Sequence, residues 1–256
     1  MKIATWNVNS LRVRLPHLLD WLAAQSPDVV CLQETKCEDA SFPGEELRQA
    51  GYSSLHHGQR GYNGVAILSR VEGGRVGRGI PAFADEQSRV IAADVHGVRI
   101  VSVYVPNGQA PGSDKYAYKL RWFEALAAWL AKELEAHPKL AVLGDFNVAP
   151  EDRDVHDPQL WEGKIHVSEP EREALRRVIG VGLVDAFRLF EQPEKSFTWW
   201  DYRMGAFRRD MGLRIDHVLL SPALAKACRS CTVDKAPRKL ERPSDHAPVV
   251  CELAIP

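Results

Sequence analysis

The sequence predicts an α/β sandwich, in which two packed β-sheets are flanked by helices, and three observations support this fold class. Short apolar segments of strand length outnumber the amphipathic helical segments. The helices are interspersed irregularly, so the pattern differs from a regular βαβ array. With 256 residues, of which 45% are hydrophobic, the chain can bury a large core. Two packed sheets with helices on their outer faces accommodate all three observations.

The first half of the chain begins with an apolar strand at residues 2–8. A helix follows, and further strands are expected at residues 28–34 and 64–69. Residues 90–105 predict a β-hairpin whose two-residue turn begins at His96. Leucines at helical spacing mark the helix between the first two strands: Leu15, Leu18, Leu19 and Leu22.

The second half contains two further helices and three strands. Ser168 and Glu171 match a capping box, which begins a helix that runs towards Gly180. A longer helix of about five turns is expected at residues 116–136. Its apolar face consists of Tyr116, Leu120, Phe123, Leu126, Leu130 and Leu134. Strands are expected at residues 139–145, 214–220 and 247–253.

Composition predicts one domain over residues 1–256, because no linker, repeat or shift in composition divides the chain. The N-terminal segment lacks an apolar signal stretch, and no run of about 18 apolar residues is present to span a bilayer. A cytoplasmic protein without membrane contact is therefore expected.

The cysteines predict neither a disulfide framework nor a zinc site. Their number, five, is odd, and their spacing is irregular. Cys228 and Cys231 form one C-x-x-C, but no second pair or matching histidines accompany them. We expect two reduced thiols near the end of a secondary-structure element.

The distribution of charge is more informative than its sum. The chain has 33 basic and 34 acidic residues, so the net charge of −1 gives no nucleic-acid signal. Residues 203–214 nevertheless have four arginines against one aspartate, and residues 235–242 have four basic residues against one glutamate. Such stripes either hold phosphates or form ordinary solvated surface, and charge alone leaves both open.

Polar side chains recur where the apolar strands end. Each one alone is usually a turn former, but strand ends that gather at one rim of a sandwich form a site. The recurring residues are Asn7, Asn9, Glu34, Tyr104, Asn107, Asp145, Asn147, Asp216, Asp245 and His246.

This set suits a magnesium or manganese ion rather than zinc, because its donors are hard carboxylate and amide oxygens. Glu34 is the expected metal anchor. Asp145, Asn147 and His246 add an acceptor, an amide and a group that titrates near neutral pH. Together they supply what phosphodiester hydrolysis needs: a polarised phosphate, an oriented water and a stabilised leaving oxygen.

Eight strings are distributed along the chain: WNVNSLR, LQETK, YNGVAILSR, YVPNG, LGDFNVAP, FTWWDYR, GLRIDHVLLS and RPSDHAPV. They resemble, in order and spacing, the exonuclease III family of DNA repair enzymes within the endonuclease/exonuclease/phosphatase superfamily. The resemblance covers nearly the whole chain. GDFN and SDH recur across the superfamily, whereas LQETK, YNGVAI and GLRIDH are more specific to the repair branch.

The resemblance implies a four-layered α/β sandwich of two mixed sheets and hydrolysis of DNA phosphodiesters with Mg²⁺ or Mn²⁺. The implied substrate is double-stranded DNA with an abasic site, a nick or a blocked 3′ end. The implied activities are abasic incision, 3′-phosphatase, 3′-phosphodiesterase and 3′-5′ exonuclease activity. A monomer is expected.

The resemblance also implies roles for individual residues. Asp145 orients and deprotonates the attacking water, or protonates the leaving group. Asn147 and His246 hold the phosphate, Asp216 fixes the His246 ring, and Tyr104 donates to a phosphate oxygen. The implied metal group, with Glu34 as its carboxylate, is Asn7, Glu34, Asp145, Asn147, Asp245 and His246. The implied substrate-binding residues are Asn9, Asn107, His166, Trp199, Arg203, Leu213 and Ile215.

In the implied binding set, Trp199, Leu213 and Ile215 form an apolar pocket for a base-free sugar, and a pocket of that size excludes an intact nucleotide. The alternative is that the tryptophans are core, which we expect for Trp200. The arginines of residues 203–214 are expected at phosphates, with a structural role as the alternative for Arg214.

One loop departs from the family pattern. His166 stands where a glycine is expected, and the following Val167-Ser168 replaces Phe-Thr. Glycine permits close approach of a backbone, whereas an imidazole does not. Our hypothesis is that His166 obstructs a continuous strand and so favours broken substrates. The alternative is a surface histidine beside Lys164.

Two rival functions remain. Another superfamily substrate, such as a phospholipid or an inositol phosphate, is disfavoured by the repair-type strings and the Trp199 pocket. A DNA-binding relative without catalysis should have gaps in the polar set, and this chain has none.

Overall fold

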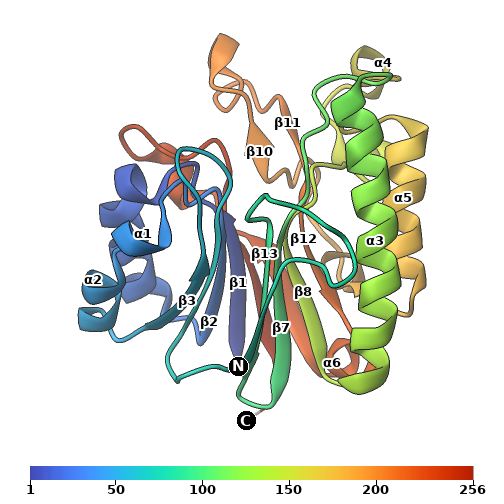
Figure 1. Cartoon of the computed structure of the whole chain (residues 1–256). Helices are drawn as coiled ribbons and strands as arrows, with labels where there is room; N and C mark the ends of the chain where they lie inside the picture. The colour runs from blue at the N-terminus through green and yellow to red at the C-terminus, as the bar shows by residue number, and fades with distance from the viewer. Residues whose placement is uncertain (256) are drawn as a thin grey trace.

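The computed structural model describes residues 1–255 and contains two six-stranded sheets that pack face to face. Helices cover the outer face of each sheet, so the molecule has four layers (Figure 1). The first sheet has the order β13 (Cys228–Val233), β14 (Val249–Leu253), β1 (Lys2–Asn7), β2 (Val29–Gln33), β4 (Val65–Ser69) and β3 (Ser53–His57). The second has the order β5 (Gly74–Arg78), β6 (Val90–Val95), β7 (Val98–Tyr104), β8 (Leu140–Asp145), β12 (Asp216–Leu220) and β9 (Val184–Asp185).

The helices lie outside the sheets, and a small hairpin rises above them. The first sheet is covered by α1 (Leu11–Gln25) and α2 (Gly44–Gln49), and the second by α3 (Asp114–Ala136) and α5 (Glu169–Gly180). The hairpin consists of β10 (Trp199–Trp200) and β11 (Gly212–Leu213). The shorter elements are α4 (Pro158–Trp161), α6 (Pro222–Ala227), η1 (Asp39–Ser41), η2 (Asp152–Asp154), η3 (Ala186–Leu189), η4 (Arg203–Gly205) and η5 (Ala236–Lys239).

Strand alternation explains how one sheet supplies two cores. In β8, Ala141 and Leu143 pack between the sheets, whereas Leu140 and Val142 pack with the core residues of α3 and α5. Successive strand side chains point to opposite faces, so a strand that is apolar throughout contributes to both layers. Continuous apolar strands are therefore typical of central positions in this sandwich.

The predicted capping box begins α5. The Ser168 side chain accepts from the backbone N–H of Glu171, and the Glu171 side chain accepts from the N–H of Ser168. The expected hairpin turn is also present, with positive φ at both His96 and Gly97, as a type I′ turn requires.

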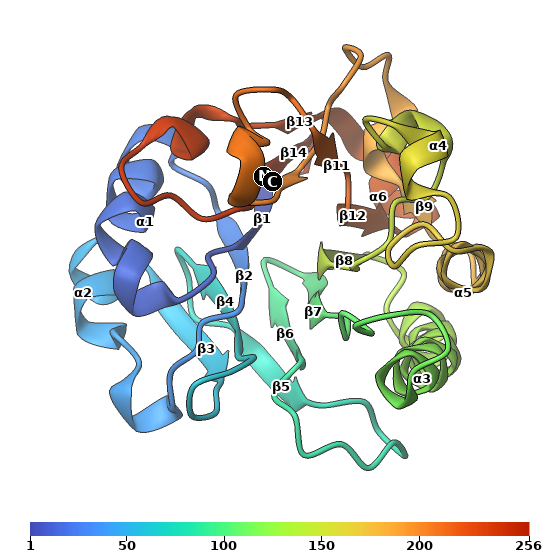
Figure 2. The same cartoon turned by 90° about the horizontal axis from the view of Figure 1, so that it is seen from above.

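Chain direction places the polar strand ends at one rim. The parallel pairs β1/β2 and β7/β8 end on the same side, and the register sets Tyr104 opposite Asp145. Strand β12 is antiparallel to β8, so Asp216, at the start of β12, also lies opposite Asp145, at the end of β8. Figure 2 looks onto this rim, with α1 and α2 on one side and α3 and α5 on the other.

The predicted fold class is confirmed, and all the strands and helices expected from the sequence are present. Cys228 and Cys231 lie in β13 as free, buried thiols, and Cys228 Sγ is 3.5 Å from Cys251 Sγ. In the part of the chain that the structure describes, no helix has the length and apolar character needed to cross a bilayer.

Candidate active site

Asp145 lies at the centre of the site, at the end of β8, and is 1% exposed. Its Oδ2 accepts from Asn7 Nδ2 at 2.9 Å, and its Oδ1 accepts from the backbone N–H of Asn147 at 2.9 Å. Asn7 ends β1, so this contact joins the two sheets at the rim. Both carboxylate oxygens are thus held in place by amides.

Glu34 follows β2 and shares the Asn7 amide, because Asn7 Nδ2 also donates to Glu34 Oε1 at 2.9 Å. Its other oxygen, Oε2, is 2.8 Å from Lys36 Nζ. That ammonium also donates to Asn9 Oδ1 at 2.6 Å. A cationic side chain therefore lies among the oxygens of Glu34 and Asn9.

Asp216 and His246 form the other wall. His246 Nδ1 is 2.8 Å from Asp216 Oδ2, and His246 Nε2 is 3.7 Å from Asp145 Oδ2. A carboxylate on Nδ1 fixes the ring and directs Nε2 towards the site. Both partners are almost completely buried.

The loop that contains His246 is held by backbone pairing. Trp199 forms an isolated antiparallel bridge with His246, and the N–H of Ala247 donates to Thr198 O at 2.7 Å. Ser244 Oγ donates to Asn7 O at 2.6 Å and accepts from the His246 N–H at 3.2 Å. The sequence SDH is therefore tied both to β1 and to the hairpin strand β10.

Burial and charge shift the protonation of these groups. Burial raises the pKa of Asp145 to about 7, although the His246 charge opposes the increase. Burial acts to lower the pKa of His246, but the carboxylates of Asp216 and Asp145 outweigh it and raise the pKa to about 10. Burial, with Glu34 and Asp145 nearby, raises the pKa of Tyr104 well above its ordinary value, so its phenol remains a donor.

The donor set fits a hard divalent cation. Among the described residues, one group has ligand atoms within 4.8 Å of one another, and it is Glu34, Asp145 and His246. The carboxylates of Glu34 and Asp145 are the kind of oxygen donor that Mg²⁺ and Mn²⁺ prefer, and the Asn7 amide holds both of them through its N–H groups. The Lys36 ammonium against Glu34 shows that this corner already attracts a positive charge.

Asn147 and Asn107 continue the polar wall. Asn147 has φ 52° and donates from Nδ2 to Val105 O at 2.9 Å. Its Oδ1 accepts from Asn107 Nδ2 at 3.4 Å. Asn107 is exposed and borders a cleft of about 830 Å³ whose lining includes Tyr62, Arg89 and Lys115.

An apolar cluster adjoins the polar wall and contains the three residues that the resemblance implied for a sugar pocket. Trp199 packs against buried Leu213 and Ile215, and its Nε1 donates to Asp245 Oδ2 at 3.0 Å. Trp200 is 0% exposed, so its predicted place in the core is confirmed. Trp161, which sequence reasoning missed, packs edge-on against Trp199 with ring centroids 6.4 Å apart.

His166 is buried, so the surface position considered from the sequence is wrong. Its Nδ1 is 2.7 Å from Asn147 O, which only accepts, so Nδ1 bears the proton. Its Nε2 is 3.5 Å from Asn107 Nδ2. Burial and the nearby Lys119 charge lower the pKa of His166 to about 3, so the ring is neutral. Its φ of 74° is a conformation that glycine adopts freely, which explains why a glycine is expected there.

Three predicted residues lie outside the central cluster. Asp245 directs its oxygens at Asn9 Nδ2 (2.9 Å) and Trp199 rather than at Glu34 or Asp145. Arg203 is exposed and pairs with Asp201, with Nη2 to Oδ2 at 2.6 Å. The ligand role of Asp245 and the substrate-binding roles of Asn9 and Arg203 stay predictions.

Arg214 is structural, as the alternative reading of the sequence held. It is 1% exposed, with Nε 2.7 Å from Asp154 Oδ1 and Nη2 2.8 Å from Asp185 Oδ2. Its Nη1 is 3.0 Å from His217 Nδ1. All three nitrogens therefore have internal partners, which leaves none for DNA.

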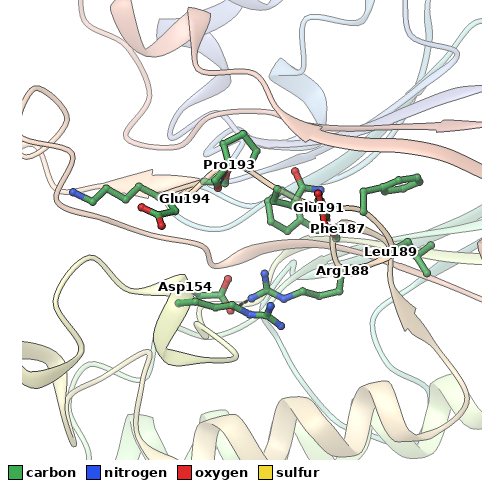
Figure 3. A pocket seen from close by; sticks show the side chains of 12 residues that line it. Asp154, Phe187, Arg188, Leu189, Glu191, Pro193 and Glu194 are labelled. Atoms are coloured by element: carbon green, nitrogen blue, oxygen red, sulfur yellow. Dashed lines mark hydrogen bonds and ion pairs between the residues drawn. The ribbon is translucent and has the colours of Figure 1, made fainter.

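A separate pocket of about 630 Å³ lies beside η3 and none of the predicted site residues line it (Figure 3). Arg188 there pairs with Asp154 at 2.6 Å. The other charged side chains of the lining include Glu191, Glu194 and Lys195. Because acidic and basic groups alternate, this pocket lacks the character of an anion or cation site.

Comparisons with known proteins agree with this geometry. The model of the endonuclease/exonuclease/phosphatase family matches residues 4–246. Exodeoxyribonuclease III of Haemophilus influenzae is 36% identical over 99% of this chain and 100% of its own length. The 3′ phosphatase NExo of Neisseria, solved with a product DNA hairpin, is 48% identical with a TM-score of 0.97 over 99% of both chains. An AP endonuclease of Archaeoglobus fulgidus is 39% identical with a TM-score of 0.97 over 100% of both chains.

Proposed function

The chain belongs to the endonuclease/exonuclease/phosphatase family, and we propose that it is a metal-dependent DNA repair hydrolase that cleans damaged 3′ ends. The observation that carries the proposal is the cluster of Glu34, Asp145 and His246 beside the apolar cluster that contains Trp199. Abasic incision and 3′-5′ exonuclease action are its secondary activities. We propose double-stranded DNA as its substrate, the cytoplasm as its location and a monomer as its active form.

In this mechanism Asp145 takes a proton from the attacking water. Its two hydrogen bonds, from Asn7 and the Asn147 backbone, orient the carboxylate. His246, fixed by Asp216, donates from Nε2 to the phosphate, and Tyr104 donates from its phenol. Such preorganised donors stabilise the charge that develops in the transition state.

Glu34 and Asp145 would hold Mg²⁺ or Mn²⁺, and the ion would supply Lewis-acid polarisation of the phosphate. The protein's contribution is to position oxygen donors at one corner of the site. Asn7 is central to this, because its amide bridges Glu34 and Asp145. A cation at this corner would compete with the Lys36 ammonium for Glu34.

Two surfaces next to the cluster suit DNA. Trp199, which is partly exposed and packs against buried Leu213 and Ile215, offers the apolar contact that a base-free sugar needs. The cleft beside Asn107 presents exposed Lys115 for phosphates and Tyr62, which is 75% exposed, for stacking. The NExo structure with bound DNA supports a DNA substrate for this architecture.

His166 is the reason we propose end cleaning over internal incision. Its ring centroid is 6.0 Å from that of Trp199, so the imidazole lies beside the proposed sugar site. A strand that continued past the damaged sugar would have to displace it, whereas a broken strand would not. The 48% identical relative is described as a 3′ phosphatase, which supports this preference.

Replacing His166 by glycine should raise incision at an internal abasic site about 10-fold or more, because the obstructing ring is removed. The positive φ of 74° suits glycine, so the backbone conformation tolerates the change. Single-turnover kinetics on an intact abasic duplex measure the effect. A His17→Gly variant on α1 serves as a distant histidine control. An incision rate equal to that of the parent would refute the role of His166.

A further inference from the structure

A buried lysine on the outer helix α3 contacts two loops of the site. Lys119 is 0% exposed, and its Nζ donates to Asn107 O at 3.1 Å and to Asn147 O at 2.8 Å. Asn107 follows β7 and Asn147 follows β8. One ammonium thus joins the ends of two neighbouring strands from behind.

The third donor of Lys119 is directed at Glu171 Oε1. Glu171 is also 0% exposed and lies in the first turn of α5. An ammonium has three N–H donors, and here each has a partner. The packing is close, since a Cβ at Gly108 would lie 2.9 Å from Lys119 Cδ.

Glu171 extends the connection to the loop that contains His166. Its Oε1 accepts from the His166 N–H at 3.1 Å, and its Oε2 accepts from the Ser168 N–H at 3.3 Å. His166 in turn reaches Asn147 O through Nδ1 at 2.7 Å. Asn147 O therefore accepts from both Lys119 and His166. The loop that contains Asn147 and the loop that contains His166 thus both depend on the charges of Lys119 and Glu171.

The two connected residues adopt unfavourable backbone conformations. Asn147 has φ 52° and His166 has φ 74°. Residues with a side chain are uncommon in this left-handed region, although asparagine and histidine adopt it more readily than most, and contacts with the surroundings help to hold them there. The hydrogen bonds of Lys119 and Glu171 act directly on these two backbones.

We propose that Lys119 and Glu171 form a positioning pair that fixes Asn107, Asn147 and His166 for catalysis; the inference rests on the proposed function. The pair lies behind the loops and acts through their backbones, so it is not itself catalytic. Because Asn147 also donates its N–H to Asp145, loss of the pair displaces the general base as well. Displacement of about 1 Å in such a group costs up to about 10²-fold in rate.

The test is a neutral replacement of the pair, Lys119→Met with Glu171→Gln. Removal of one partner alone leaves a buried unpaired charge and lowers stability, whereas the neutral pair avoids that penalty. Kinetics on a nicked duplex with a 3′-phosphate, in Mg²⁺, should show kcat reduced about 10- to 100-fold and KM changed less than about threefold. Glu171→Gln alone, which keeps the shape of the side chain, should give a smaller loss of kcat. Lys132→Met, at an exposed position of the same helix, is the matched control.

A folded double variant whose kcat lies within about twofold of the parent would overturn the proposal, and so would a parental kcat in Glu171→Gln. Amide hydrogen exchange of His166 gives a readout that does not depend on activity. Protection of that N–H should fall more than about 10-fold in the double variant and stay unchanged in Lys132→Met. If the parent hydrolyses no DNA but this protection still falls, the proposed function fails while the coupling of the pair to His166 stands; unchanged protection refutes the coupling.

Discussion

Replacing Asp145 by asparagine should lower the rate of DNA hydrolysis about 10³- to 10⁴-fold, because the group that accepts the proton of the attacking water is lost. An asparagine retains the shape of the side chain and can still accept from the Asn147 N–H. DNA binding should therefore survive. This combination separates a hydrolase from a DNA-binding relative without catalysis.

Two measurements on the Asp145→Asn variant test this result. Single-turnover cleavage of a nicked 3′-phosphate duplex gives the rate, and fluorescence anisotropy of the same duplex gives Kd. Asp20→Asn, at an exposed position of α1, is the matched control and should behave as the parent. A parental cleavage rate in Asp145→Asn would exclude this residue as the general base.

Replacing Arg214 by methionine should lower the free energy of unfolding by about 3–5 kcal/mol, because buried carboxylates lose their partner. Asp185 is 9% exposed, and the only ion pair found for it among residues 1–255 is with Arg214. Asp154 keeps its ion pair with Arg188, so it contributes less than Asp185 to the loss of stability. Urea unfolding followed by circular dichroism measures the change, with exposed Arg177→Met as the control. A loss below about 1 kcal/mol would show that Arg214 contributes little to the fold.

The difference in free energy of unfolding between the parent and Arg214→Met should become smaller in acid. Burial acts to raise the pKa of Asp185, but Arg214 overrides it and holds the pKa below its ordinary value. The stabilisation from this pairing is therefore complete above the ordinary carboxyl pKa and is lost as pH falls through the lowered one. In that acidic range the parent loses the stabilisation from the pairing of Asp185 with Arg214. The variant lacks Arg214, so its stability changes less.

The central strands could be predicted from the sequence because they are buried on both faces. Residues 140–145 of β8 are all buried and are apolar up to the polar end of the strand, and β1 and β4 have a similar character. The edge strands were missed. In β5 (Gly74–Arg78) glycines and arginines leave no apolar alternation, and β3 (Ser53–His57) is only half-buried. Their positions depend on backbone pairing with β6 and β4.

The polar cluster was predicted because strand ends on the same side of a sandwich converge. Asn7 and Asp145 are 138 residues apart in the chain, yet each ends a strand at the same rim. The roles of Asp245 and Arg203 could not be tested in this way, since their positions follow from loops. Trp161 lies on the four-residue helix α4, and that segment is too short to show periodicity.

Lys119 was missed although the sequence contained a signal. It lies between Tyr116 and Phe123 at the i+3 and i−4 spacings, in the middle of the buried face of α3. A lysine at a core position of an amphipathic helix requires a buried partner, and the capping residue Glu171 provides it. The partner belongs to another helix, so the pair itself could be seen only in three dimensions.

The measurement that tests the account most directly is cleavage of three labelled duplexes, each with Mg²⁺ and with a chelator. One contains an internal abasic analogue, one a nick with a 3′-phosphate, and one an undamaged recessed 3′ end. We expect rapid release of the 3′-phosphate, slower action on the other two, and none with the chelator. Hydrolysis that persists in the chelator, or its absence on all three duplexes with Mg²⁺, would contradict a metal-dependent DNA repair hydrolase. Internal incision as fast as phosphate release would instead make the protein an abasic endonuclease, and His166 would have no role in selecting broken strands.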